Sequence, residues 1–142
     1  MRPSSAVFLG SLLFAATGCG GDGVLEPPGP PAPAQPPTLT EIQTAIFTPR
    51  CAIPGCHASP GAQFDLVLTE GASHASLVGV PSGERQQFLR VEPGNADDSY
   101  LYMKLLGDPR TIGDRMPLLG APLNAGDLDR IRRWIEAGAL DD

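Results

Sequence analysis

A proline-rich run at residues 26–37 constrains this chain most, because seven of its twelve residues are proline. Proline fixes the backbone φ angle and has no amide proton, so the run can join neither a helix interior nor a central strand. We expect an extended, semi-rigid spacer, which at about 3.1 Å per residue would span roughly 35 to 40 Å. The chain of 142 residues is therefore expected to have a leader at its start and a single domain at 38–142.

The residues before this spacer have the pattern of an export signal. Arg2 provides a short positive segment, and the apolar residues 6–16 are too few to span a bilayer but suit the core of a signal peptide. They lead through small residues to Cys19, a pattern that resembles the lipobox of bacterial lipoproteins. The resemblance implies a signal peptide at 1–18 and a lipidated Cys19 at the start of a linker, 19–37.

Lipidation of Cys19 would anchor the protein to a membrane, because two or more acyl chains on one residue give stable binding. Gly20 rather than Asp follows the cysteine, and by resemblance to enteric lipoproteins this favours the outer membrane, with the domain facing the periplasm. The alternative is an ordinary signal peptide cleaved nearby, which would leave Cys19 free.

Composition narrows the function classes and bears on the core. Ten Lys and Arg against sixteen Asp and Glu give a net charge of -6, which argues against nucleic-acid binding, since that needs a basic face. Aromatic residues make up only 6% of the chain, so a large self-sufficient core is not expected. We expect a group other than protein side chains to fill part of the core.

Three short helices are expected in the domain. The first begins with Thr40 and Gln43 as a capping box and ends near Pro49. Residues 59–93 are rich in Gly, Ser and Pro, which predicts loops and short turns. Residues 97–99 supply capping side chains for a second helix at 100–106, which Gly107 ends.

The last helix has the clearest signals. Asn124 is a suitable N-cap, acidic residues occupy the first turn and basic residues lie towards the end, an order that suits the helix dipole. Gly138 stops the helix. One face is apolar and consists of Leu128, Ile131, Trp134 and Ile135.

Two cysteines are followed directly by a histidine, in the order Cys51, Cys56, His57. This order is typical of haem c attachment, in which two thiols add across the two vinyl groups of the porphyrin and the next imidazole faces the iron. The usual interval between the cysteines is two residues, and here it is four. Pro54 and Gly55 in the interval can still turn the chain so that both sulfurs point the same way.

Two other interpretations of these residues remain. A disulfide between Cys51 and Cys56 suits an oxidising compartment, although it leaves His57 unexplained. A zinc site formed by Cys51, Cys56, His57 and His74 has suitable ligands, but a neighbouring Cys and His fit one tetrahedral ion poorly.

With these residues in this order, the domain resembles a class I c-type cytochrome, and looks most like the mono-haem domains of exported bacterial proteins. The shared pattern comprises a first helix, the Cys-x4-Cys-His motif, Val-Glu-Pro-Gly at 91–94 before 99–101, and a Met116–Pro117 pair ahead of the final helix. The resemblance implies an all-α, cytochrome c-like fold of about three short helices and long loops around one covalently bound haem c.

The resemblance also implies roles for single residues. Cys51 and Cys56 would hold the haem by thioethers, His57 would be the proximal axial ligand of the iron, and Met116 would be the distal axial ligand. His74 and Met103 are alternatives to Met116, although Met103 falls in an expected helix, where Met more often fills the core.

Further residues are expected near the haem. Arg115 or Arg90 would pair with a propionate, unless they are ordinary surface arginines, and Trp134 would pack against the first helix or the haem edge. The side chains expected to enclose the porphyrin are Phe47, Leu68, Leu101, Leu105, Ile131 and Trp134.

His/Met ligation raises the potential of the iron and leaves it no open position, which favours electron transfer over catalysis. The implied function is one-electron transfer between redox proteins of the cell envelope, with neither nucleic acid nor a small-molecule substrate as partner. One alternative is a haem peroxidase or gas-binding haem sensor in which Met116 leaves the iron. Another is a non-haem lipoprotein binding module with a Cys51–Cys56 disulfide.

Overall fold

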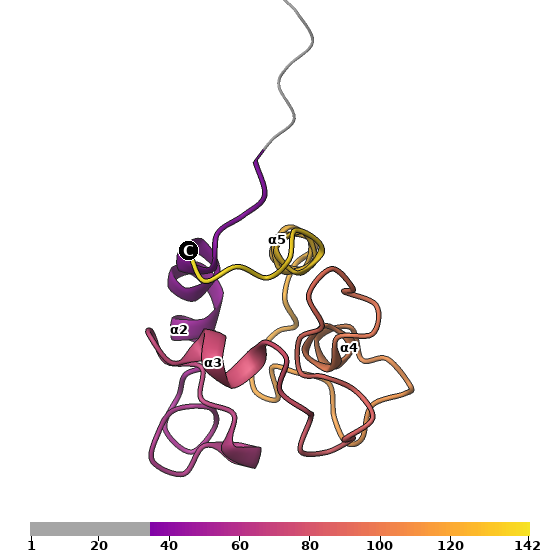
Figure 1. The fold of residues 1–142 in the computed structure, drawn as a ribbon. Coiled ribbons are helices and arrows are strands. Elements are labelled where there is room, and N and C mark those ends of the chain that lie inside the picture. Colours follow the sequence, from indigo (N-terminus) through magenta and orange to yellow (C-terminus); the bar gives the residue numbers. More distant parts are fainter. Residues whose placement is uncertain (1–34) are drawn as a thin grey trace, which may run out of the picture. The chain divides into compact units, whose positions relative to one another are not determined.

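The computed structural model describes residues 35–142, which form one compact unit of helices and loops (Figure 1). The expected signal peptide, Cys19 and most of the proline-rich run lie outside the described residues. Within 35–142 there is no β-strand, only isolated bridges, so the expected all-α class is confirmed. The elements in chain order are α1 (Leu39–Ile42), η1 (Gln43–Phe47), α2 (Thr48–Arg50), η2 (Gln63–Asp65), α3 (Ser73–Leu77), α4 (Tyr100–Leu106) and α5 (Ala125–Glu136).

The first helix starts earlier than the sequence predicted. Its capping box is formed by Thr38, whose hydroxyl accepts from the Glu41 amide at 3.1 Å, and by Glu41, whose carboxylate accepts from the Thr38 amide at 3.0 Å. The expectation that Thr40 and Gln43 form the box was wrong. Thr40 instead donates to the Asp142 carbonyl at 2.8 Å, and Gln43 points into the core.

The helical path continues through η1, a π-helix, into α2. The wide π turn falls just ahead of Pro49, which has no amide proton for the carbonyl four residues earlier. The path ends where the amides of Cys51 and Ala52 both donate to the Phe47 carbonyl, at 2.9 and 2.7 Å. The end of this helical run therefore fixes the position of the first cysteine.

The other two expected helices are confirmed. α4 follows Ser99 and ends at Gly107, whose φ of 73° is a left-handed conformation that glycine adopts without strain. α5 begins at Asn124, whose side chain accepts from the Asp127 amide at 2.9 Å. Its apolar face is buried at Ile131, Trp134 and Ile135.

The stretch 59–93 is not wholly irregular. It contains the short helix α3, which the sequence analysis missed because five residues are too few for a helical period to show. The remainder consists of loops, the single turn η2 and isolated bridges such as Val78 with Val91.

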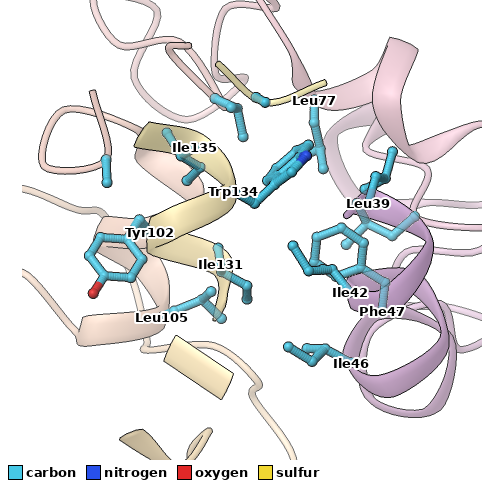
Figure 2. Close-up of a cluster of buried hydrophobic side chains, with 14 of the residues drawn as sticks. Leu39, Ile42, Ile46, Phe47, Leu77, Tyr102, Leu105, Ile131, Trp134 and Ile135 are labelled. Carbon is cyan, nitrogen blue, oxygen red and sulfur yellow. The ribbon is translucent and has the colours of Figure 1, made fainter. Parts of the chain in front are cut away.

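The main core lies where α5 packs on α1 and α4. Figure 2 shows Trp134 and Ile131 of α5 near Ile42 and Phe47, with Leu105 of α4 on the other side. Trp134 is 1% exposed, and its indole N–H donates to the Leu140 carbonyl at 2.9 Å. None of the helices within residues 35–142 is long and apolar enough to cross a bilayer.

Candidate functional site

A cavity of about 470 Å³ opens between the Cys51–His57 turn, the residues after it, α4 and the loop that carries Met116. This volume lies in the usual range for cofactor and ligand sites. Cys51, Cys56, His57 and Met116 all line it, so the structure brings these four sequence-predicted residues to one site. Much of the remaining wall is leucine, contributed by Leu66, Leu68, Leu77, Leu101, Leu105, Leu118 and Leu119.

Only some of the side chains expected to enclose a porphyrin face this cavity. Leu68, Leu101 and Leu105 line it. Phe47, Ile131 and Trp134 do not, because they pack in the core between α1, α4 and α5. Trp134 packs towards the first helix, which is one of the two positions expected for it, whereas the expectation that Phe47 and Ile131 line the cavity was wrong.

A tight turn holds the two cysteines. Cys51 ends α2, the Ile53 amide donates to the Cys51 carbonyl at 2.8 Å, and the Cys56 amide donates to the Ile53 carbonyl at 2.9 Å. Gly55 has a φ of 81°, a conformation that a residue with a side chain rarely adopts. Both cysteines are free thiols at the cavity wall. The four-residue interval thus brings both cysteines to the wall of one cavity.

The Cys51 thiol is largely shielded from water, and this burial raises its pKa to about 11. The positive charge of neighbouring Arg50 acts in the opposite direction but is the smaller effect. Cys51 therefore stays a neutral thiol at physiological pH.

His57 is held by the chain that passes beside it. Its Nδ1 lies 3.2 Å from the Leu66 carbonyl oxygen, and its own carbonyl accepts from the Leu68 amide at 2.8 Å. A carbonyl can only accept, so Nδ1 carries the proton and Nε2 keeps its lone pair. Burial lowers the pKa of His57 below its ordinary value, which favours the neutral ring. A neutral imidazole with one nitrogen held by a hydrogen bond is the form that ligates metals.

Met116 lines the same cavity, although it follows His57 by 59 residues in the sequence. It is half-buried, and its amide donates to the Lys104 carbonyl at 2.9 Å. Met103, by contrast, is 1% exposed inside α4 and is not part of the cavity wall. Of the two methionines, Met116 is thus the one placed with His57.

His74 lies elsewhere. It is part of α3, its Nε2 is 2.9 Å from the Ala139 carbonyl oxygen, and it borders a separate cavity of about 80 Å³. The structure therefore does not support His74 as a second ligand beside His57. It also argues against the zinc interpretation, since no group of three or more His, Cys, Asp or Glu side chains within residues 35–142 is arranged to hold a metal.

The two candidate arginines differ. Arg90 lines the cavity, and its guanidinium donates to the Ser76 carbonyl at 2.8 Å and the Phe64 carbonyl at 2.6 Å. Arg115 does not line it, because its Nε donates to the Leu105 carbonyl at 2.7 Å and so fastens the Met116 loop to the end of α4.

Sequence reasoning missed a polar cluster in the cavity wall. Glu84, Tyr100 and Lys104 all line the cavity, with the Lys104 ammonium 3.2 Å from Glu84 Oε2 and the Tyr100 hydroxyl donating to the same oxygen at 2.8 Å. Burial raises the pKa of Tyr100. Lys104 gave only one signal in the sequence, a charged residue within an otherwise apolar helix, and Glu84 gave none.

Comparison of the chain with protein-family models, with curated proteins and with solved structures gave no match.

Proposed function

We propose that this domain carries one covalently bound haem c, has a cytochrome c-like fold, and works as a mono-haem electron carrier. The observation that carries the proposal is the shared cavity of Cys51, Cys56, His57 and Met116. Two thiols for attachment, an imidazole and a thioether are the donors that a His/Met-ligated haem c needs. The side chains that line the cavity are therefore of the types that bind haem c.

Each residue would have a distinct task. Cys51 and Cys56 would tether the haem through thioethers, His57 would offer Nε2 to the iron, and Met116 would offer its thioether sulfur. The leucine-rich wall would exclude water from the site, which strengthens the electrostatic effect of the charged groups nearby. Haem supplies a one-electron ferric–ferrous couple, whose potential depends on its ligands and on such surroundings.

The two axial donors decide between electron transfer and catalysis. If both His57 and Met116 ligate the iron, no position stays open for peroxide or a gas. The placement of Met116 in the cavity thus favours an electron carrier over the peroxidase and sensor alternatives. Its partners would be redox proteins of the cell envelope, and the acidic net charge of -6 favours partners with a basic patch.

The remaining part of the proposal concerns location. A lipidated Cys19 would anchor the protein to the outer membrane, and the proline-rich spacer would hold the domain away from the lipid. Metabolic labelling with a radioactive fatty acid tests this: we expect label in the wild-type protein and none in Cys19→Ala.

The first test of the haem proposal is covalent attachment. The protein is produced in a host competent for haem c attachment, extracted with acidified organic solvent, and examined by its visible spectrum. We expect the colour to stay with the wild-type protein and to be absent from the Cys51→Ser/Cys56→Ser double variant. Colour that washes out, or never appears, would leave the disulfide module as the better interpretation.

The second test addresses the distal ligand through carbon monoxide, which binds ferrous haem at an open position. We expect slow binding to the wild-type protein and fast binding to Met116→Ala. Met103→Leu is the matched control, because it changes a methionine outside the cavity with little change in volume. Fast binding to the wild-type protein, together with peroxide turnover, would favour the peroxidase or sensor alternative.

A further inference from the structure

The loop that carries Met116 is docked on the end of α4. The carbonyls of Lys104 and Leu105 lie in the last turn of this helix, where carbonyls need partners from outside. Met116 and Arg115 supply those partners, through the Met116 amide at 2.9 Å and Arg115 Nε at 2.7 Å. These two bonds fix the loop at the cavity end only.

Ile112 is held from two sides, four residues before Met116. Its amide donates to the Tyr100 hydroxyl at 3.0 Å, and its carbonyl accepts from the Lys104 ammonium at 2.6 Å. The backbone amide and the backbone carbonyl of Ile112 are therefore both hydrogen-bonded to side chains of α4. The Ile112 side chain itself is 46% exposed, so packing holds this part of the loop only in part.

Glu84 completes the arrangement from a distant part of the chain. Its Oε2 receives the Tyr100 hydroxyl at 2.8 Å and lies 3.2 Å from the Lys104 ammonium. The side chains of Lys104 and Glu84 are only 9% and 16% exposed. A shielded ion pair adds little net stability, but it specifies one arrangement, because breaking it leaves an unpaired charge away from water.

We infer that Glu84, Tyr100 and Lys104, which we call the loop clamp, are positioning residues for Met116 as an iron ligand. Glu84 orients the Tyr100 hydroxyl and the Lys104 ammonium. These two groups bind the backbone of Ile112, and the loop held in this way presents Met116 to the cavity that it shares with His57. The inference rests on the proposed function and adds what keeps the distal ligand in place.

The test uses the haem-loaded protein and two variants that cut the clamp separately. Tyr100→Phe removes the hydroxyl that Ile112 donates to and keeps the ring, while Lys104→Met removes the ammonium and keeps most of the stem. We expect each to increase the rate of carbon monoxide binding to the ferrous protein by about fivefold, the change that the loss of one hydrogen bond of about 1 kcal/mol gives. The far-red absorption band of the Met-ligated ferric protein should weaken in parallel.

Two controls separate positioning from general destabilisation. Arg110→Ala breaks exposed ion pairs to Asp98 and Asp108 in the same segment, and Ile135→Val trims the main core away from the cavity. Both should leave the carbon monoxide rate at the wild-type value even if the melting temperature falls. A variant that fails to load haem is examined instead by amide hydrogen exchange, where protection at Ile112 and Met116 should fall while that in α5 is kept.

The outcomes distinguish this inference from the proposed function. Wild-type rates in Tyr100→Phe and Lys104→Met, with a fast rate in Met116→Ala, would overturn the loop clamp and leave the haem proposal standing. Wild-type protein without covalent haem, or Met116→Ala with unchanged carbon monoxide binding, would overturn both.

Discussion

Gln43 offers the sharpest test of how the fold supports the site. Its side chain is 5% exposed and makes three hydrogen bonds: Nε2 donates to the Leu68 carbonyl at 2.9 Å and to the Thr48 hydroxyl at 3.0 Å, and Oε1 accepts from the Ser73 hydroxyl at 2.7 Å. The amide thus joins the first helical run to α3 and to Leu68, which lines the cavity.

Replacing Gln43 with Ala should destabilise the protein strongly. The lost bonds to Leu68 and Ser73 leave two buried partners unsatisfied at about 1 kcal/mol each, whereas the exposed Thr48 hydroxyl can bond water, so the free energy of unfolding should fall by about 2 kcal/mol. For a domain of this size this corresponds to a decrease in melting temperature of about 8 °C. Ser73→Ala, which removes one of the three bonds, should cost about 1 kcal/mol.

The assay is urea and thermal unfolding of the purified protein, followed by circular dichroism. Gln87→Ala is the matched control, because this glutamine is exposed and its loss should change the free energy of unfolding by less than about 0.5 kcal/mol. A loss below about 1 kcal/mol in Gln43→Ala would refute the reasoning, since it would mean that the two buried partners find other bonds at little cost.

Three further predictions follow from single features. Trp134→Ala should lower the free energy of unfolding by about 3 to 5 kcal/mol, measured by urea unfolding, and a loss as small as that of a surface residue would contradict the placement of Trp134 in the main core. Thr38→Ala should cost about 1 kcal/mol by removing the cap of α1; if it is neutral in thermal unfolding, the capping box is assigned to the wrong residues. In haem-free Cys56→Ser protein, the rate of Cys51 alkylation, followed by mass spectrometry, should increase with pH up to about pH 11. At pH 8 this rate should be about a hundredfold below that of a thiol of pKa 9.0. A rate that stops increasing near pH 9 would show that burial does not raise the pKa of Cys51.

The parts of the fold that were predictable from sequence depend on neighbours along the chain. The end of α4 is set by Gly107 and the start of α5 by Asn124, each within one turn of the helix that it limits. The capping side chain expected before α4 was wrong, because the Ser99 hydroxyl bonds the backbone of Glu92 and Asn95 and makes no bond to the helix. The buried face of α5 follows from its apolar spacing. The cysteine–histidine motif is equally local, and so Cys51, Cys56 and His57 could be named in advance as candidate site residues.

The parts that escaped prediction depend on partners far away in the sequence. Gln43 looked like a capping residue because nothing nearby in the sequence shows that its side chain will donate to the Leu68 carbonyl and accept from the Ser73 hydroxyl. Glu84 looked like an ordinary charge in a loop, since its partner Lys104 lies twenty residues further on. Such contacts exist only once the chain has folded, and propensity or spacing carries no trace of them.

The hydrogen bond from His57 Nδ1 to the Leu66 carbonyl has a consequence for how this protein can change over evolutionary time. Many metal-binding histidines rely on a carboxylate side chain, which one substitution can remove. Here the acceptor belongs to the backbone, so every residue type at position 66 keeps it. Point mutation at position 66 can therefore alter this part of the cavity wall, while the orientation of the imidazole is inherited with the path of the chain.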